Sequence, residues 1–260
     1  MASLAARRYH RLAPVILVMA ILVFTTVAYA FFAPSPAGAT EGSSEAQVVE
    51  GERLFAANCA TCHGLDALGT EIAPSLVGVG AAAVDFQVGT GRMPAQASAP
   101  QAVAKPRQFD AEETAQLAAY VASLGEGPMI PTDEQIDGSL GDPAYGGELF
   151  RINCAMCHGS VGGGGALTEG KFAPSLWTTD PRHIYEAMES GPSNMPVFND
   201  GNITPENKRD IIAYLEAQRE GSPGGHALGA LGPVSEGLWA WILGVGLIIG
   251  ITVWVGAKSS

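Results

Sequence analysis

The sequence has few charged residues, and few of those are basic. Charged residues make up 15% of the 260, and 14 Lys and Arg stand against 26 Asp and Glu, for a formal net charge of −12. Nucleic acids and anionic lipid surfaces bind through basic faces, so this balance argues against both as partners. The chain also lacks any long polar tract, which excludes a mainly disordered protein. Its length allows two domains of about 100 residues each.

Two hydrophobic runs are long enough to span a bilayer, residues 12–32 and residues 238–257. Arginines precede the first run and Lys258 follows the second. The positive-inside rule therefore places the short ends, 1–11 and 258–260, in the cytoplasm. The residues between the runs then lie on the extracytoplasmic side. The sequence predicts a multi-pass protein of the plasma membrane.

The first hydrophobic run has a second interpretation, as a cleaved signal peptide. Ala28-Tyr29-Ala30 has the small residues of a cleavage site after an apolar run. The run is longer than a usual signal-peptide core and continues through Phe31 and Phe32, which favours a retained membrane anchor.

All four cysteines fall in two copies of one motif, C-x-x-C-H, at 59–63 and 154–158. This is the attachment signature of c-type haem: each cysteine forms a thioether to a vinyl group, and the following His is held beneath the iron. A redox dithiol or half of a zinc site also uses C-x-x-C, but a dithiol needs no His and zinc needs four converging ligands. We therefore expect two covalently bound haem c groups. The predicted attachment residues are Cys59, Cys62, Cys154 and Cys157, and the predicted proximal iron ligands are His63 and His158.

The two motifs belong to an internal repeat. A segment running from Gly through Leu-Phe to Asn precedes each motif, and Ala-Pro-Ser-Leu, Met-Pro and Ala-Tyr follow it in the same order. The chain therefore contains the same domain twice. The matching segments are 51–58 and 146–153, 73–76 and 173–176, 93–94 and 195–196, and 119–120 and 213–214.

Each copy is expected to begin and end with a helix. Asp110 can cap the last helix of the first copy, and Thr204, followed by Pro205 at the first helical position, can cap that of the second. The middle of each copy is rich in Gly and Pro and lacks periodicity, so we expect loops laid around a cofactor. The fold class is all-α. The predicted division is an N-terminal end (1–11), a transmembrane helix or signal peptide (12–32), a linker (33–45), domain 1 (46–127), a linker (128–142), domain 2 (143–221), a linker (222–237), a transmembrane helix (238–257) and a tail (258–260).

The order of these features resembles the class I cytochrome c domain in both copies. In that family a Pro after the attachment motif accepts a hydrogen bond from the proximal His, and a later Met is the distal iron ligand. The resemblance gives these roles to Pro74 and Pro174, and to Met93 and Met195.

A single Met is usually a core gap-filler, but the same Met-Pro recurs at equivalent places of the repeat, which favours the ligand role. His183 is the rival distal ligand in the second copy. An iron with a His and a Met ligand has no open position for substrate, and the thioether raises its reduction potential. These features favour an electron carrier, without catalytic residues of its own.

The whole layout resembles the dihaem cytochrome c subunit of the actinobacterial cytochrome bc complex. The resemblance implies a subunit of a quinol–cytochrome c reductase, which is a translocase. Its electrons would come from menaquinol through the cytochrome b subunit and the Rieske iron–sulfur subunit. They would pass directly to the copper-bearing subunit of an aa-type cytochrome c oxidase in a supercomplex.

Two other functions remain open. A cbb-type oxidase subunit also has two haem domains on a membrane anchor, but would not be expected to end in a second membrane span. A dihaem peroxidase or thiosulfate dehydrogenase would need one haem with a displaceable or non-Met ligand, and the two matching Met-Pro loops argue against that.

Overall fold

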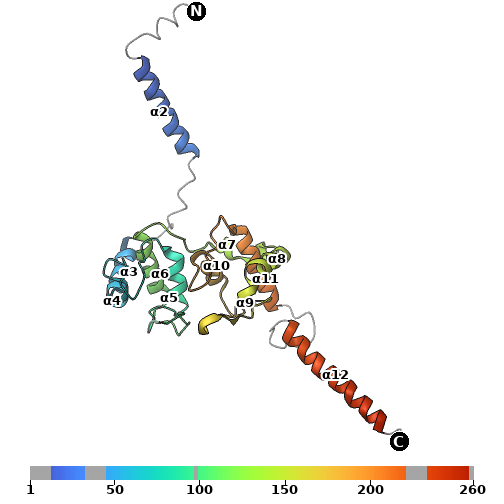
Figure 1. The fold of residues 1–260 in the computed structure, drawn as a ribbon. Coiled ribbons are helices and arrows are strands. Elements are labelled where there is room, and N and C mark those ends of the chain that lie inside the picture. The colour runs from blue at the N-terminus through green and yellow to red at the C-terminus, as the bar shows by residue number, and fades with distance from the viewer. Residues whose placement is uncertain (1–12, 33–44, 97–98, 221–232, 258–260) are drawn as a thin grey trace, which may run out of the picture. The chain divides into compact units, whose positions relative to one another are not determined.

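The computed structural model describes residues 13–32, 45–96, 99–220 and 233–257. The predicted ends, 1–11 and 258–260, lie outside these ranges, as do most of the linkers 33–45 and 222–237. Residues up to Gly42 form one compact unit and the rest of the chain a second one. The first unit contains α2 (Ala13–Phe32) (Figure 1).

The second unit is mostly helical, and both copies of the repeat have four α-helices in the same order (Figure 1). The first copy consists of α3 (Glu45–Asn58), α4 (Ala60–His63), α5 (Gly80–Gly89) and α6 (Ala111–Ser123). The second copy consists of α8 (Pro143–Asn153), α9 (Ala155–His158), α10 (Pro181–Ser190) and α11 (Pro205–Glu220). The remaining elements are α7 (Asp133–Ile136), η1 (Gly138–Leu140), β1 (Gly165–Ala166), η2 (Thr168–Gly170), β2 (Phe172–Ala173) and α12 (Pro233–Ala257). The antiparallel pair β1–β2, in register Gly165 with Ala173, is the one exception to the all-α expectation among the described residues.

The first and last helices of each copy cross at a glycine. A Cβ on Gly51 of α3 would lie 2.0 Å from the carbonyl oxygen of Gln116 in α6, so only glycine permits this approach. The rings of Phe55 and Tyr120 fill the space beside the crossing, with centroids 5.2 Å apart.

The second copy repeats this crossing between α8 and α11. A Cβ on Gly146 would lie 1.8 Å from the carbonyl oxygen of Asp210. Phe150 and Tyr214 have ring centroids 5.4 Å apart. In each copy, the crossing holds in place the helix that leads into the attachment motif, α3 in the first copy and α8 in the second.

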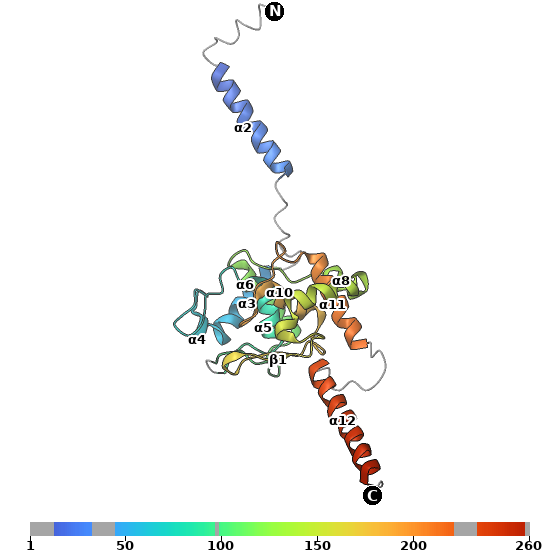
Figure 2. The same ribbon diagram turned by 45° about the vertical axis from the view of Figure 1, so that its right-hand side comes forward.

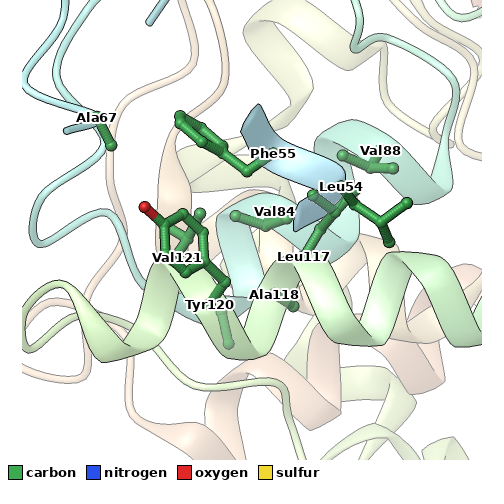
Figure 3. Close-up of a cluster of buried hydrophobic side chains, with 10 residues drawn as sticks. Leu54, Phe55, Ala67, Val84, Val88, Leu117, Ala118, Tyr120 and Val121 are labelled. Carbon is green, nitrogen blue, oxygen red and sulfur yellow. The ribbon is translucent and has the colours of Figure 1, made fainter. Parts of the chain in front are cut away.

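The hydrophobic core of the first copy lies between α3, α5 and α6 (Figure 3). Phe55 is 2% exposed and Leu117 of α6 is 2% exposed, and Val84 and Val88 of α5 pack against them. The core of the second copy lies between α8, α10 and α11. Its members are Phe150, Cys154, Ile184, Tyr185, Met188, Ile203, Ile211, Ile212, Tyr214 and Leu215.

The predicted helix starts are confirmed. Asp110 accepts a hydrogen bond from the backbone N–H of Glu113, whose side chain accepts one from the N–H of Asp110, which is a capping box. The N–H of Asn207 donates to Oγ1 of Thr204, with Pro205 at the first helical position.

The expectation that the middle of each copy is all loop is wrong. Each copy has a ten-residue helix there, α5 in the first and α10 in the second. These two helices pack against each other and join the copies (Figures 1 and 2). Beside them, Nε2 of Gln101 donates to the carbonyl oxygen of Phe172 at 2.7 Å, and the N–H of Phe172 donates back to Oε1 at 3.0 Å.

Among the described residues, one helix is long and apolar enough to cross a membrane, Gly237–Ala257 within α12. Its large apolar side chains are exposed, with Trp241 at 71% and Leu247 at 65%. Such a surface needs lipid or another helix to cover it. In α2, the apolar stretch Pro14–Thr25 is shorter.

Candidate functional site: two attachment turns

Both C-x-x-C-H motifs form the same local structure. Cys59 precedes α4, and its carbonyl oxygen accepts the backbone N–H of His63 at 3.0 Å. Cys154 precedes α9 and accepts the N–H of His158 at 2.9 Å. In each motif the single helical turn brings the two cysteines and the histidine close together, as attachment to one planar group requires.

The proximal histidines make matching contacts with the two predicted prolines. Nδ1 of His63 lies 2.8 Å from the carbonyl oxygen of Pro74, and Nδ1 of His158 lies 3.0 Å from that of Pro174. A protonated Nδ1 donating to this oxygen leaves Nε2 unprotonated, as a metal ligand must be. Burial lowers the pKa of His158 against the opposing effect of the Pro174 hydrogen bond, which favours the neutral imidazole.

A cavity of about 580 Å³ lies beside the second attachment turn. Its lining includes Cys154, Cys157, His158 and Met195, so the predicted attachment, proximal and distal residues of this copy share one space. Apolar side chains complete the wall, and they include Phe150, Ile184 and Leu215. This combination fits a covalently attached haem.

In the first copy the corresponding residues meet at the core. His63 is 9% exposed. Cys59 and Met93 are partly buried and pack against the same cluster, which contains Leu54 and Phe55. The structure therefore packs the predicted attachment cysteine and the predicted distal Met against the same core.

The cysteines do not suit a redox dithiol. Burial, with a smaller effect from Cys62, raises the pKa of Cys59 to about 11. Burial and then Cys157 raise the pKa of Cys154 to about 12. Thiol–disulfide exchange needs a thiolate, and reactive dithiols have lowered pKa values, so the raised pKa values of Cys59 and Cys154 argue against this use.

The cysteines do not form a zinc site either. In the described part of the chain, one group of three His, Cys, Asp or Glu side chains is close enough to share an ion, and it contains no cysteine. Its members are Asp85, His183 and Glu186.

His183, the rival distal ligand, lies in that group on α10. Its Nε2 lies 4.0 Å from Oδ2 of Asp85 in α5, and its ring meets the ring of Phe86 edge-on at 6.2 Å. Burial lowers the pKa of His183, while Asp85 raises it. His183 also lines the cavity beside His158.

Two glycines of the site escaped the sequence analysis. Gly69 and Gly164 each follow the proximal His by six residues, and each N–H donates to the carbonyl oxygen of that His at 2.8 Å. Both have positive φ, and an added Cβ would lie 2.5 Å from the amide nitrogen of Ser75 or 2.7 Å from the carbonyl oxygen of Ala173. Their equal distance from the histidine in both copies could have identified them from the sequence.

Three basic side chains of the cavity were also missed. Arg92, Arg107 and Lys171 line the space beside His158. The guanidinium of Arg92 lies 4.6 Å from the ring centre of Phe86, and burial lowers its pKa. Haem carries two carboxylates, and arginines are suited to pair with them. Because Arg92 and Arg107 belong to the first copy, this part of the second site forms only when the copies pack together.

Both copies of the repeat match models of known protein families. The family model for cytochrome c matches residues 48–125, and the model described as cytochrome C oxidase, cbb3-type, subunit III matches residues 141–215. Both copies of the repeat are therefore cytochrome c domains.

Curated relatives extend the match over the whole chain. The cytochrome bc1 complex cytochrome c subunit of Corynebacterium efficiens is 43% identical over 83% of this chain and 78% of that protein. The protein of the same name from Mycobacterium tuberculosis is 41% identical over 97% of this chain and 93% of that protein. This chain belongs to the family of cytochrome bc1 complex cytochrome c subunits. It is a membrane-anchored electron-transfer subunit with two covalently bound haem c groups.

The cbb-type alternative has less support. The cbb3-type cytochrome c oxidase subunit CcoP of Rubrivivax gelatinosus is 30% identical over 72% of this chain and 59% of that protein. Both the identity and the coverage are lower than for the bc1 family.

Proposed function

We propose that this chain takes electrons from the Rieske iron–sulfur subunit of a quinol–cytochrome c reductase and passes them to the copper-bearing subunit of an aa-type cytochrome c oxidase. The cytochrome b subunit completes the reductase, whose quinol is menaquinol, and the whole assembly is a proton-translocating supercomplex. The observation that carries this proposal is the duplicated attachment turn with its His–Pro contact, in a chain similar to bc1 subunits over nearly its whole length. With two haem c groups, this one chain can carry electrons directly to the oxidase, in place of a diffusing cytochrome c.

The site residues have the following roles. When bound, haem c supplies one-electron transfer at its iron. The four cysteines hold the groups covalently, and His63 and His158 are proximal ligands kept in one tautomer by Pro74 and Pro174. Met93 and Met195 are the distal ligands. The placement of Met195 in the same cavity as His158 supports its assignment.

This ligand set favours electron transfer over substrate chemistry. A bound haem iron held by a His and a Met would have no position left for peroxide or thiosulfate. The distal thioether raises the reduction potential, which suits a carrier located between an iron–sulfur centre and a copper centre.

The two domains stand in tandem at 46–127 and 143–221, on the extracytoplasmic side of the plasma membrane. The run 12–32 is a retained transmembrane helix, and 238–257 is the second span, with both chain ends in the cytoplasm. The apolar, exposed surface of α12 and the Trp side chains near its ends support the second span.

Affinity purification tests the proposal. With a tag on this chain and a mild detergent, we expect cytochrome b, the Rieske subunit and the aa-type oxidase to co-purify, and quinol to support oxygen consumption by the purified material. Isolation of the dihaem chain with a cbb-type catalytic subunit, or alone with peroxidase activity, would contradict it.

A further inference from the structure

Three ionisable side chains meet where α5 packs against α10. Asp85 comes from α5, and His183 and Glu186 come from α10, where a spacing of three residues places them on one face of the helix. One ligand atom from each lies within 4.8 Å of the other two. Asp85 and Glu186 are each the sixth residue of their helices, so the packing of equivalent helices brings two carboxyl groups together across the domain boundary.

The carboxylate of Glu186 has no hydrogen-bond donor, and its close neighbour is a second carboxyl group, that of Asp85. Its side chain is fully buried, at 0% exposure, and no donor reaches either carboxylate oxygen. Buried carboxyl groups in folded proteins are paired with a cation, bound to a metal or neutralised by a proton. The oxygens of Glu186 face the other two members of the cluster, so the partner that it requires belongs at that point.

The distance between Asp85 and His183 points to a bridging ion. Oδ2 and Nε2 are 4.0 Å apart, which is too long for a hydrogen bond. Two ligands on one tetrahedral zinc ion, each about 2.0–2.2 Å from it, lie roughly 3.3–3.6 Å apart, so a movement of about half an ångström would let Asp85 and His183 bind the same ion. The close approach of the imidazole to α5 depends on Gly89, where an added Cβ would be 3.1 Å from Nε2.

We propose that Asp85, His183 and Glu186 bind one divalent transition-metal ion, best matched by Zn²⁺, between the two haem domains. One imidazole nitrogen with carboxylate oxygens is a donor set that zinc accepts, with water completing four ligands. Because Asp85 belongs to the first domain and the other two ligands to the second, the ion fastens the domains together. His183 also lines the cavity beside His158, so the positive charge lies next to the second haem site.

The competing occupant of the cluster is a proton. A protonated Glu186 can donate a hydrogen bond to Asp85, and burial together with the charge of Asp85 raises the pKa of Glu186 to about 10. A proton would satisfy the two carboxyl groups but would leave His183 without a direct partner at 4.0 Å. Metal analysis separates the two arrangements.

The experiment uses the full chain in its purified complex. After equilibration with micromolar Zn²⁺ and removal of free metal, zinc is quantified by mass spectrometry against haem c. We expect the wild type to hold about one zinc more, per two haem c groups, than each of three variants, Asp85→Asn, His183→Gln and Glu186→Gln. Each substitution should weaken zinc retention at least about tenfold. Glu148→Gln, at an exposed position of α8, is the matched control and should retain the wild-type amount.

X-ray absorption at the zinc edge of the wild type gives a second result that does not depend on variants folding. We expect a shell of nitrogen and oxygen with an imidazole contribution and no sulfur. Sulfur ligands, zinc that persists in all three variants, or no zinc above the Glu186→Gln level would overturn the proposal. In the last case, an infrared band of a protonated carboxyl group that disappears in Glu186→Gln would assign the cluster to a shared proton.

Discussion

Nδ1 of His158 lies 3.0 Å from the carbonyl oxygen of Pro174, and His63 and Pro74 make the same contact at 2.8 Å in the other domain. Both contacts hold the imidazole so that Nε2 is the free nitrogen. Each histidine is the last residue of its attachment turn. The two predicted proximal histidines thus make the same contact in both domains.

The distal ligands can be tested by substitution. Met93→His and Met195→His should each remove about half of the weak sulfur-to-iron charge-transfer band of the ferric protein and lower the potential of the affected haem. The reason is that an imidazole replaces the thioether. Met156→His is the matched control, because Met156 lies in an attachment motif but is 94% exposed. If neither substitution alters the band, the methionines are not the ligands.

The helix crossing in the second domain predicts unequal effects at two adjacent glycines. Gly146→Ala should destabilise the domain by about 3 kcal/mol, because the methyl group would meet the backbone oxygen of Asp210 at 1.8 Å. Gly147→Ala should cost about 1 kcal/mol, since its nearest neighbour at 2.9 Å is the ring of Tyr214, which can shift. Guanidinium unfolding followed by haem absorbance measures both. Equal midpoints for the two variants would show that the crossing is looser than described.

A buried lysine in the second domain gives another prediction. Lys208 is 0% exposed and its ammonium donates to Glu189 and, at 2.7 Å, to Asp200. Lys208→Met should destabilise the domain by about 3–5 kcal/mol, because it leaves the carboxylate of Glu189 in a partly buried place without its cation.

Adding Glu189→Gln to Lys208→Met should recover most of that loss, since the side chain of Asp200 is 63% exposed and can be solvated. The same unfolding measurement applies. A double variant no more stable than Lys208→Met would mean that the lysine acts through packing, not charge.

The α12 helix carries a prediction about assembly. A side chain added at Gly246 or Gly250 meets nothing within 4 Å, so leucines there fit the chain itself. Gly246→Leu with Gly250→Leu should leave haem-stained protein in the membrane but prevent co-purification of cytochrome b, because small residues allow close packing of membrane helices.

Gly244→Leu is the matched control for that pair. Gly244 precedes Gly246 by two residues and therefore lies on nearly the opposite face of the helix. We expect this variant to keep cytochrome b. Retention by both variants would mean that the extracytoplasmic domains alone hold the complex.

The sequence predicted the terminal helices of each domain well, because the segments that form them occur twice and the last helix of each copy has a local capping signal. It did not predict α5, whose small apolar residues are buried on several sides and show no amphipathic period. For α10 the signals were present: Asp180 caps it, Pro181 is at the first position and Gly191 ends it in the left-handed conformation. The Gly- and Pro-rich residues around this segment nevertheless led to the prediction of a loop.

At the site, the repeated motif predicted the cysteines and histidines, and the resemblance to class I cytochrome c domains predicted the prolines. All of these residues lie close together in the chain within each copy. The contact between domains could not be predicted in this way. Gln101 forms hydrogen bonds with Phe172, 71 residues further along the chain, and Asp85 approaches Glu186 across a still longer separation. Such neighbours depend on how two folded domains pack, and no local pattern records that.

The direct test of the central claim is the reduction of the haem groups by menaquinol in the purified complex without oxygen. We expect both haem c groups to be reduced by menaquinol and an oxygen pulse to reoxidise them. We further propose that electrons enter at the first domain and leave from the second. With Cys154→Ala and Cys157→Ala together, the haem at Cys59 and Cys62 should then still be reduced while oxygen consumption stops. If quinol leaves haem c oxidised in the wild-type complex, this chain does not carry electrons from quinol to oxygen.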